Sequence, residues 1–372
     1  MPSFKQTSKT YLVGGAVRDK LLGLDVVERD WVVVGSSAEE MKAAGFNQVG
    51  KDFPVFLHPE TKEEYALARK ERKVLPGHTG FEFDANSSIT LEEDLGRRDL
   101  TINAIAQDEY GVIIDPYNGR DDIDSKTLRH VAHAFTEDPL RVLRLARFAA
   151  RFAELGFRIN PETHELCADM VALGDLDELS PERIFQEMDK ALATPQPQVF
   201  FNFLRDIKAS VRLWPEVSSD ALILPSKVLA ATNKVQRFAL LFATSAADEV
   251  EARCRALRAP RQYQDLALLC SRHLRDYKQV MEMNAGDIVG FIYQLDGIRR
   301  PDRFEEFCMT CQLILNGGGN TTEERDQQER LISSLASVSR ITSKDVSRDL
   351  RGPQIGEAIR QLQISAVAAL QD

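Results

Sequence analysis

The hydrophobic pattern of this chain changes once, near Asp138, and that change limits the fold more than any other feature. Before it, short apolar or alternating runs are separated by Gly, Asp and Pro, as is typical of strands and turns. These runs are Tyr11-Leu-Val, Asp30-Trp-Val-Val-Val, Pro54-Val-Phe-Leu and Tyr65-Ala-Leu-Ala. After it, apolar residues recur at helical spacing, and prolines divide the pattern into pieces. The sequence therefore predicts an α+β head followed by an all-helical region without convincing strands.

Length and composition are those of an ordinary soluble protein. The 372 residues, 43% hydrophobic and 28% charged, can bury a core in each of about two to four domains. No apolar stretch approaches the roughly 20 residues that span a bilayer, and the polar start does not resemble a signal peptide. We expect a cytoplasmic protein, with no membrane or protein partner indicated.

The five cysteines do not form a metal-binding pattern. Cys308 and Cys311 make one Cys-x-x-Cys pair, and no second Cys or His pair follows at zinc spacing. We interpret all five as small buried apolar residues and predict no sulfur-bound metal.

Charge is distributed unevenly along the chain, whose net charge is −10. Residues 251–372 carry 17 Lys and Arg against 17 Asp and Glu, so all of the net negative charge lies in residues 1–250. The basic residues of the neutral part are nearly all Arg, which suits planar phosphate contacts. This distribution fits a polyanionic partner with a local binding surface, and it equally fits a solvated helix surface.

A glycine pair, Gly14-Gly15, follows the first strand-like run and opens a predicted helix that contains Arg18. Backbone N–H groups at such a helix start can face an anion. The segment matches neither a Walker loop nor a GxGxxG motif, so a tight structural turn is the alternative.

Three acidic residues lie on or beside predicted strands. Residues two apart in a strand face the same side, so Glu28 and Asp30 would present both carboxylates together. Glu64 begins another strand-like run. Together the three predict a two-Mg²⁺ site of the kind that supports phosphoryl transfer, and solvent-facing strand acids are the alternative.

Two further segments combine arginines with carboxylates. Arg97-Arg98 precedes a predicted helix that Asp99 or Thr101 could cap, and adjacent guanidinium groups also suit a triphosphate. Asp138 and Arg141 are three residues apart at the start of the long helix. They are therefore neighbours on one face, where an ion pair within the helix is the simplest interpretation.

Five motifs occur in the same order as in a known family. They are Gly14-Gly15-Ala-Val-Arg-Asp, Glu28-x-Asp30, Arg97-Arg98-Asp-Leu-Thr-Ile-Asn-Ala, Glu137-Asp138-Pro-Leu-Arg141 and Ser180-Pro-Glu182-Arg183. In this order the chain resembles the class II tRNA nucleotidyltransferases, the CCA-adding enzymes, in particular their gammaproteobacterial branch. The resemblance covers essentially the whole chain.

The resemblance implies a polymerase β-type nucleotidyltransferase head followed by a helical neck, body and tail that hold the acceptor arm of tRNA. The expected boundaries are 1–136, 137–205, 206–285 and 286–372. It implies template-independent addition of CCA to the tRNA 3′ end from CTP and ATP, with Mg²⁺ as cofactor.

The resemblance also implies roles for individual residues. Glu28, Asp30 and Glu64 would be catalytic, with Glu28 and Asp30 as metal ligands. Asp138 and Arg141 would form a protein template for the base of the incoming nucleotide. The other implied nucleotide-binding residues are Gly15, Arg18, Arg98, Arg144 and Arg147.

The implied template has a simple chemical basis. Cytosine and adenine both carry an amino donor beside a ring-nitrogen acceptor, whereas uracil and guanine carry a carbonyl oxygen at that place. A carboxylate and a guanidinium would therefore accept C and A. With U or G, each unmade hydrogen bond would cost about 1–3 kcal/mol.

The chain departs from the family pattern in two places. Glu28 stands where the family motif has Asp, which keeps the charge on a longer side chain. None of the six histidines is followed by Asp, so we expect no HD-type phosphohydrolase activity.

Two other functions remain open from the sequence. A bacterial poly(A) polymerase would share the head, although such enzymes usually have a basic tail and this chain ends in Ala-Ala-Leu-Gln-Asp. A non-catalytic tRNA-binding relative is the second alternative, and Glu28 is the only residue that supports it. The sizeable loop Lys70–Leu91 favours addition of the complete CCA rather than part of it.

Overall fold

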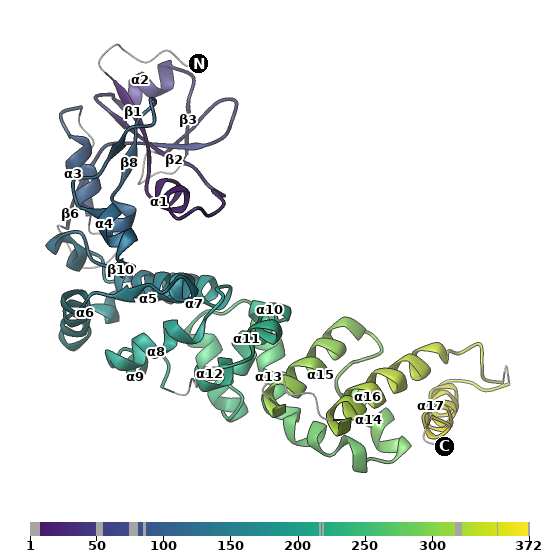
Figure 1. The fold of residues 1–372 in the computed structure, drawn as a ribbon. Coiled ribbons are helices and arrows are strands. Elements are labelled where there is room, and N and C mark those ends of the chain that lie inside the picture. Colours follow the sequence, from purple (N-terminus) through teal and green to yellow (C-terminus); the bar gives the residue numbers. More distant parts are fainter. Residues whose placement is uncertain are drawn as a thin grey trace. The chain divides into compact units, whose positions relative to one another are not determined.

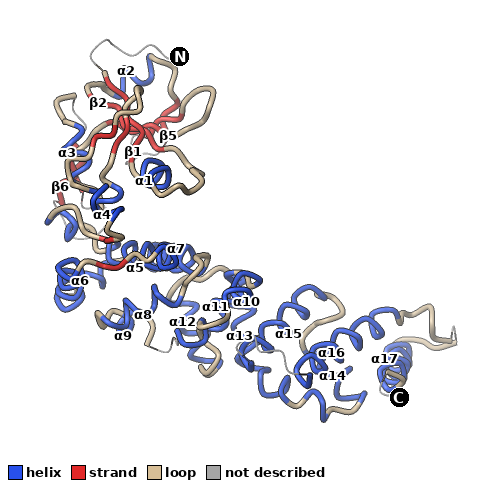
Figure 2. The backbone as a smooth tube through the Cα atoms, in the orientation of Figure 1, coloured by secondary structure: helices blue, strands red, loops and turns tan. Residues whose placement is uncertain are grey.

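The computed structural model describes residues 8–49, 55–73, 81–84, 87–215, 217, 219–316, 322–347 and 349–370. The chain divides into two compact units, Met1–Leu213 and Trp214–Asp372. Figure 2 shows that the strands gather in the N-terminal part and that helices make up most of the remainder. The predicted α+β class is therefore confirmed. The four-part division into head, neck, body and tail stays a prediction.

A mixed sheet is the centre of the first unit (Figure 1). In the described residues it has seven strands in the order β3-β4-β5-β2-β1-β8-β9. β2 pairs antiparallel with β1 and parallel with β5, and Asp30 lies opposite Glu64 in the parallel register. The strands are β1 (Lys9–Val13), β2 (Asp30–Val34), β3 (Asn47–Val49), β4 (Val55–Leu57), β5 (Glu64–Leu67), β8 (Ala106–Gln107) and β9 (Ile113–Ile114). A separate hairpin pairs β6 (Lys70–Lys73) with β7 (Phe81–Asp84).

The sheet separates two apolar clusters because successive side chains of a strand point to opposite faces. Val32 belongs to the cluster that contains Leu95 of α3 (Leu91–Gly96). The next residue, Val33, belongs to the cluster that contains Met41 of α2 (Ala38–Ala43). The central strand β2 is thus buried on both faces, while its first residue, Asp30, remains exposed.

Short helices connect the strands, and longer ones follow the sheet. Near the sheet lie α1 (Gly15–Leu21), the 3₁₀ turn η1 (Thr101–Asn103) and α4 (Gly119–Asp124). After the sheet come η2 (His133–Glu137), α5 (Leu140–Phe152), η3 (Ala153–Leu155), α6 (Pro161–Leu173), η4 (Asp175–Glu178), α7 (Pro181–Leu192), α8 (Gln198–Asp206) and α9 (Ser210–Leu213).

The apolar stripe predicted after Asp138 forms the buried face of α5, which includes Val142, Leu145 and Phe148. Two details differ from the prediction. The helix begins at Leu140, so Asp138 lies just before it with an extended backbone. A two-residue strand, β11 (Arg158–Ile159), pairs with β10 (Thr127–Leu128), so the region after Asp138 is not free of strands. Two residues are too short to give a periodic signal.

The second unit is helical throughout its described residues. Its elements are η5 (Ser219–Leu222), α10 (Ser226–Ala231), α11 (Lys234–Leu240), α12 (Ala247–Ala256), α13 (Arg261–Lys278), η6 (Val280–Glu282), α14 (Ala285–Gln294), α15 (Pro301–Asn316), α16 (Thr322–Arg340) and α17 (Pro353–Ala368). Its core holds Trp214, Tyr263, Tyr277 and Phe307. All five cysteines of the chain are buried as free thiols, as predicted.

Some expectations fall on residues outside the described ranges. Within the loop Lys70–Leu91, residues 74–80, 85 and 86 are among them, as is Pro54. No helix in the described part of the chain has both the length and the apolar character that a membrane crossing requires.

We predict that Gly119→Ala destabilises the first unit. A Cβ atom at Gly119 would lie 2.2 Å from the carbonyl oxygen of Thr101, so α4 and η1 would have to move apart. We expect overpacking to lower the free energy of unfolding by about 1–3 kcal/mol. Urea unfolding of the full chain measures this change in the free energy of unfolding.

Gly356→Ala is the control, because a Cβ atom there meets no other atom within 4 Å. Gly356 is the fourth residue of α17, so alanine there should stabilise the second unit by up to about 0.5–1 kcal/mol. Equal effects of the two substitutions would contradict this account of Gly119.

Candidate active site

A cavity of about 630 Å³ lies in the first unit beside the start of β2. It is formed by the turn before α1, the segment after α3, and helices α5 and α7. Its lining residues are Gly14, Gly15, Arg18, Glu28, Asp30, Arg97, Arg98, Asp99, Asn103, Asp138, Leu140, Arg141, Arg144, Arg147, Phe148, Arg151, Arg183 and Lys190. Thus all predicted site residues except Glu64 line one cavity.

The cavity is strongly basic in an acidic protein. Its described lining contains nine Arg or Lys residues against four Asp or Glu, whereas the chain has a net charge of −10. A concave site lined by one sign of charge concentrates ligands of the opposite sign. The cavity therefore suits a polyanion such as a triphosphate.

Gly14 allows Arg98 to approach the backbone closely. Its φ of +67° lies in the left-handed region, and a Cβ atom there would be 2.7 Å from Nη1 of Arg98. The Gly14 N–H donates to the carbonyl of Ile105 at 3.1 Å, which ties this turn to the end of the arginine motif. The glycine pair is a tight structural turn that also lines the cavity.

Asp94 orients the two adjacent arginines. Its fully buried carboxylate accepts from Nη2 of Arg97 at 3.0 Å and from Nη2 of Arg98 at 3.3 Å. Burial alone would raise the pKa of Asp94, but the two guanidinium charges hold it below its usual range. Arg98 keeps a buried Nε without a partner among the described residues, so its donors are not all used within the protein.

A second buried carboxylate, Asp99, connects the head to α5. It accepts from Arg144 at 2.7 Å and from the amide of Asn103 at 2.8 Å. Burial opposes ionisation, yet Arg144 and the hydrogen bonds hold the pKa of Asp99 well below its usual range. Asn103 in turn accepts from Arg18, whose guanidinium lies 5.2 Å from the ring centroid of Phe148.

Two more acidic residues pair with arginines of α5. Glu187, on α7, accepts from Nε of Arg147, and Asp19, on α1, accepts from Arg151 at 2.9 Å. The carboxylates offset the repulsion between the neighbouring arginines and fix the positions of their guanidinium groups. Arg144, Arg147 and Arg151 of α5 are thus tied to carboxylates from other parts of the first unit.

The two residues of the expected template have separate partners. Asp138 accepts from Nη2 of Arg183 at 3.0 Å and from the Leu140 N–H at 3.1 Å. Arg141 is buried and donates to the backbone carbonyls of Ala134 and Arg97. Both side chains line the cavity, and they hold their positions through other groups.

The predicted metal-binding carboxylates are only partly brought together. Glu28 lies in the loop before β2 rather than within the strand, but it lines the cavity with Asp30. The pKa of Asp30 lies above its usual value, mainly because the carboxylate is partly removed from water in the cavity; the Arg98 charge lowers the pKa and the Glu28 charge raises it. Glu64 is exposed beside Asp30 and does not line the cavity. Among the described residues, no three His, Cys, Asp or Glu side chains form a ready metal-binding group.

Comparison with known proteins identifies the family. Residues 10–129 match the family model of the poly A polymerase head domain, and residues 156–220 match that of a probable RNA and SrmB-binding site of polymerase A. The chain is 45% identical over 363 residues to the CCA-adding enzyme of Pseudomonas putida strain W619, covering 96% of this chain and 97% of the relative. The chain belongs to the CCA-adding enzyme family.

Other relatives agree with this assignment. The multifunctional CCA protein of Teredinibacter turnerae is 43% identical, with 97% of this chain and 98% of that protein covered. The crystal structure of the Bacillus stearothermophilus CCA-adding enzyme with CTP superposes with a TM-score of 0.67 at 25% identity, covering 98% and 90% of the two chains. The family resemblance inferred from the five motifs is confirmed.

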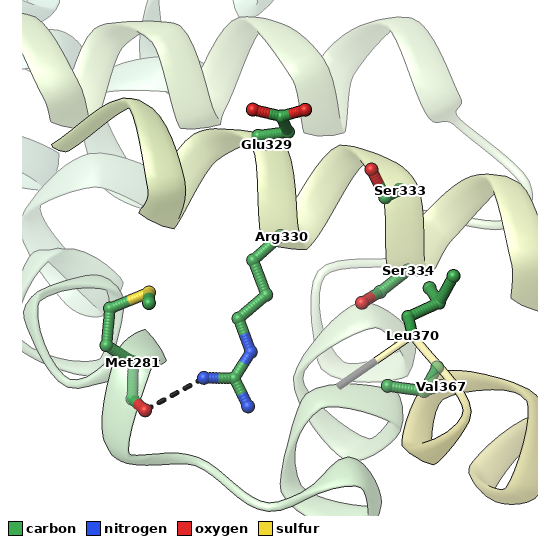
Figure 3. Close-up of a pocket in the computed structure, with 7 residues that line it drawn as sticks. All are labelled: Met281, Glu329, Arg330, Ser333, Ser334, Val367 and Leu370. Atoms are coloured by element: carbon green, nitrogen blue, oxygen red, sulfur yellow. Dashed lines mark hydrogen bonds between the residues drawn. The ribbon is translucent and has the colours of Figure 1, made fainter. Parts of the chain in front are cut away.

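The second unit of this CCA-adding family member contains another cavity, of about 560 Å³ (Figure 3). Arg330 donates there to the carbonyls of Met281 at 2.8 Å and Met283 at 2.6 Å. The guanidinium therefore ties α16 to the segment after α13. Its lining holds one carboxylate, Glu329, so the cavity lacks the paired acids of the first unit.

Sequence reasoning missed the residues that orient the arginines. Asp19, Asp94, Asp99 and Glu187 were not among the predicted site residues, and neither were Arg151 and Lys190. For Asp94 a signal existed, because it precedes Arg97 and Arg98 by three and four residues. For Glu187 none existed, because its partner lies 40 residues away on another helix.

We predict that Asp99→Asn destabilises the first unit at neutral pH and reduces its acid sensitivity. The folded pKa of Asp99 lies below the unfolded value, so its contribution is present above about pH 4 and is lost as pH falls. Because Arg144 is 35% exposed, we expect a loss of only about 1–3 kcal/mol at pH 7.

Urea unfolding of the wild type and the variant at pH 7 and pH 3 measures this difference. The difference in free energy of unfolding between the two proteins should be smaller at pH 3 than at pH 7. A difference of the same size at both pH values would contradict an ionised Asp99 paired with Arg144.

Proposed function

We propose that the cavity of the first unit binds CTP and ATP and that the protein adds CCA to the 3′ end of tRNA with the help of Mg²⁺. The observation that carries this proposal is the set of oriented arginines around Glu28 and Asp30 in a member of the CCA-adding family. We infer the reaction from the CCA-adding relatives and the roles of individual residues from the geometry of the cavity.

The triphosphate would lie among the basic groups near Gly15. Arg98, Arg144 and Arg147 would contact phosphate oxygens. Arg18 also lines the cavity and would help to orient Arg144 through Asn103 and Asp99. Guanidinium groups held by carboxylates need little reorganisation when charge develops, which is the main source of catalysis in phosphoryl transfer. The tRNA 3′ oxygen would bond to the α-phosphorus as pyrophosphate leaves.

Glu28 and Asp30 fit a Mg²⁺ site. Mg²⁺ usually binds one or two carboxylates together with substrate phosphates, and two adjacent carboxylates line this cavity. The ion would neutralise charge on the phosphates and lower the pKa of the attacking hydroxyl. Glu64 lies in register with Asp30 on β5, and we propose it as the third catalytic carboxylate.

Asp138 and Arg141 would select the base. Arg183 holds the Asp138 carboxylate, and two backbone carbonyls hold the Arg141 guanidinium. Two rigid groups of this kind match the amino group and ring nitrogen of C and A. Specificity then depends on the fixed positions of both side chains.

A single assay separates this function from its alternatives. The protein is incubated with tRNA that lacks its 3′ end, Mg²⁺ and CTP with ATP, and the products are sequenced. Addition of CCA supports the proposal, long A tails would indicate a poly(A) polymerase, and unchanged tRNA would indicate a non-catalytic relative.

We predict that Asp30→Ala abolishes incorporation because it removes a carboxylate that we assign to Mg²⁺. Binding of tRNA should remain nearly unchanged, since we assign Asp30 to the metal and not to contacts with the RNA. Turnover above about a tenth of the wild-type rate would contradict the assignment.

Glu28→Asp is the matched variant, because it keeps the charge and restores the residue found in the family motif. If the longer Glu side chain displaces the metal, this variant should add nucleotides faster than the wild type. A slower variant would show that the site is adapted to Glu28.

We predict that Asp138→Ala relaxes nucleotide choice. Without the carboxylate, the preference for C and A over U and G should fall by the equivalent of about 1–3 kcal/mol, and correct addition should slow. Relative kcat/KM for the four nucleotides on a truncated tRNA measures this preference.

Arg183→Gln is the control for a purely structural role. It removes the partner of Asp138 but keeps the carboxylate, so base choice should relax less than in Asp138→Ala. Unchanged selection in Asp138→Ala, together with a lower melting temperature, would reduce Asp138 to a stabilising ion pair.

A further inference from the structure

A second basic cavity, of about 550 Å³, lies in the first unit. It shares no described lining residue with the candidate active site. Its lining residues are Ser125, Lys126, Thr127, Arg129, Gly156, Arg158, Ile159, Asn160 and Pro161. Three of these are cationic, and none of the described lining residues is acidic. The cavity therefore attracts anions.

The pairing of β10 with β11 brings the basic residues together. Thr127 lies opposite Arg158, and the Arg158 N–H donates to the Lys126 carbonyl at 2.8 Å. Leu128 is fully buried, so Thr127 and Arg129 project to the other face of their strand. Lys126 and Arg129 from one segment and Arg158 from another thus line the same cavity.

Two of the three cations are available to a ligand. Arg129 uses its Nε on both oxygens of Asp122, at 3.1 and 3.2 Å. In the described part of the chain, Lys126 and Arg158 form no ion pair. This differs from the active-site arginines, most of which are paired with carboxylates.

Lys126 occupies a conformation that disfavours a lysine. It directly follows the C-cap of α4 with φ of +57°, where glycine is the usual residue. Its ammonium lies 5.3 Å from the ring centroid of Phe157, which holds the charge beside the cavity.

The second cavity is connected to the backbone of the active site. The Thr101 N–H donates to the Arg129 carbonyl at 2.9 Å, and the Val131 N–H donates to the Asp99 carbonyl at 3.3 Å. The strand segment with Arg129 therefore runs beside the arginine motif. The two cavities are therefore built on one hydrogen-bonded framework.

The geometry points to a binding site for the phosphate backbone of the RNA substrate at Lys126, Arg129 and Arg158. The described lining has no aromatic ring to stack a base, and the hydroxyls of Ser125 and Thr127 lie 3.0 Å apart and can bond each other. Cationic groups without base contacts position a nucleic acid and do not read its sequence. This inference rests on the proposed function, since it takes tRNA as the partner.

The test compares Lys126→Gln/Arg158→Gln with Lys20→Gln/Lys42→Gln, an equal charge change at exposed residues outside both cavities. Affinity for tRNA that lacks its 3′ end is measured against salt concentration, without nucleotides. The first variant should reduce the slope of log affinity against log salt by about one to two units, because each lost phosphate contact removes roughly 0.7–0.9. The control should change it little.

An unchanged slope, or equal changes in both variants, would overturn the inference. So would a higher KM for CTP with unchanged tRNA affinity, which would mean that the cavity takes free nucleotides. Because the binding test uses no nucleotide, a wild-type protein that binds tRNA but adds nothing would contradict the proposed function alone.

Lys126→Gly separates binding from folding. Glycine relieves the left-handed conformation, so the melting temperature should stay equal or rise while the affinity for tRNA falls. A variant that is more stable and binds tRNA as tightly as the wild type would also overturn the inference.

Discussion

The pairing of buried carboxylates with arginines is the interaction on which the site depends. Eight arginines lining one cavity would repel one another and disperse without such partners. Asp94, Asp99 and Glu187 together hold four of these arginines, which are Arg97, Arg98, Arg144 and Arg147. Removing one partner leaves a charge without compensation, so each pair is more important for order than for net stability. The result is a set of cationic groups fixed before any ligand arrives.

This network also explains why a sheet and a helical region cooperate within the first unit. The sheet supplies Asp30, the turns around it supply Gly14 and Arg98, and α5 supplies four further arginines, which are Arg141, Arg144, Arg147 and Arg151. The ion pairs of Asp99 with Arg144 and of Asp19 with Arg151 join the two regions. A family that acts on nucleotides and RNA needs such a surface in a protein whose overall charge is negative.

The sequence predicted the parts of this site better than their connections. Periodicity located the head and the α5 stripe, and the motif order identified the family. Neither periodicity nor motif order could show that Asp138 pairs with Arg183, because that contact joins residues 45 apart. Strand alternation predicted that Glu28 and Asp30 face one side, but Glu28 lies in the loop before β2. Alternation gave no information on the parallel register of Asp30 with Glu64 or on the boundaries of the cavity. Long-range pairs such as Arg147 with Glu187 leave no local pattern.

A crystal structure of the protein with CTP and Mg²⁺ tests the central claim most directly. The account predicts the triphosphate among Arg98, Arg144 and Arg147, the metal at Glu28 and Asp30, and the cytosine edge at Asp138 and Arg141. It further predicts that the Asp94 and Asp99 pairs stay intact when the nucleotide binds. A nucleotide bound outside this cavity, or one that breaks these pairs to reach the arginines, would contradict the account.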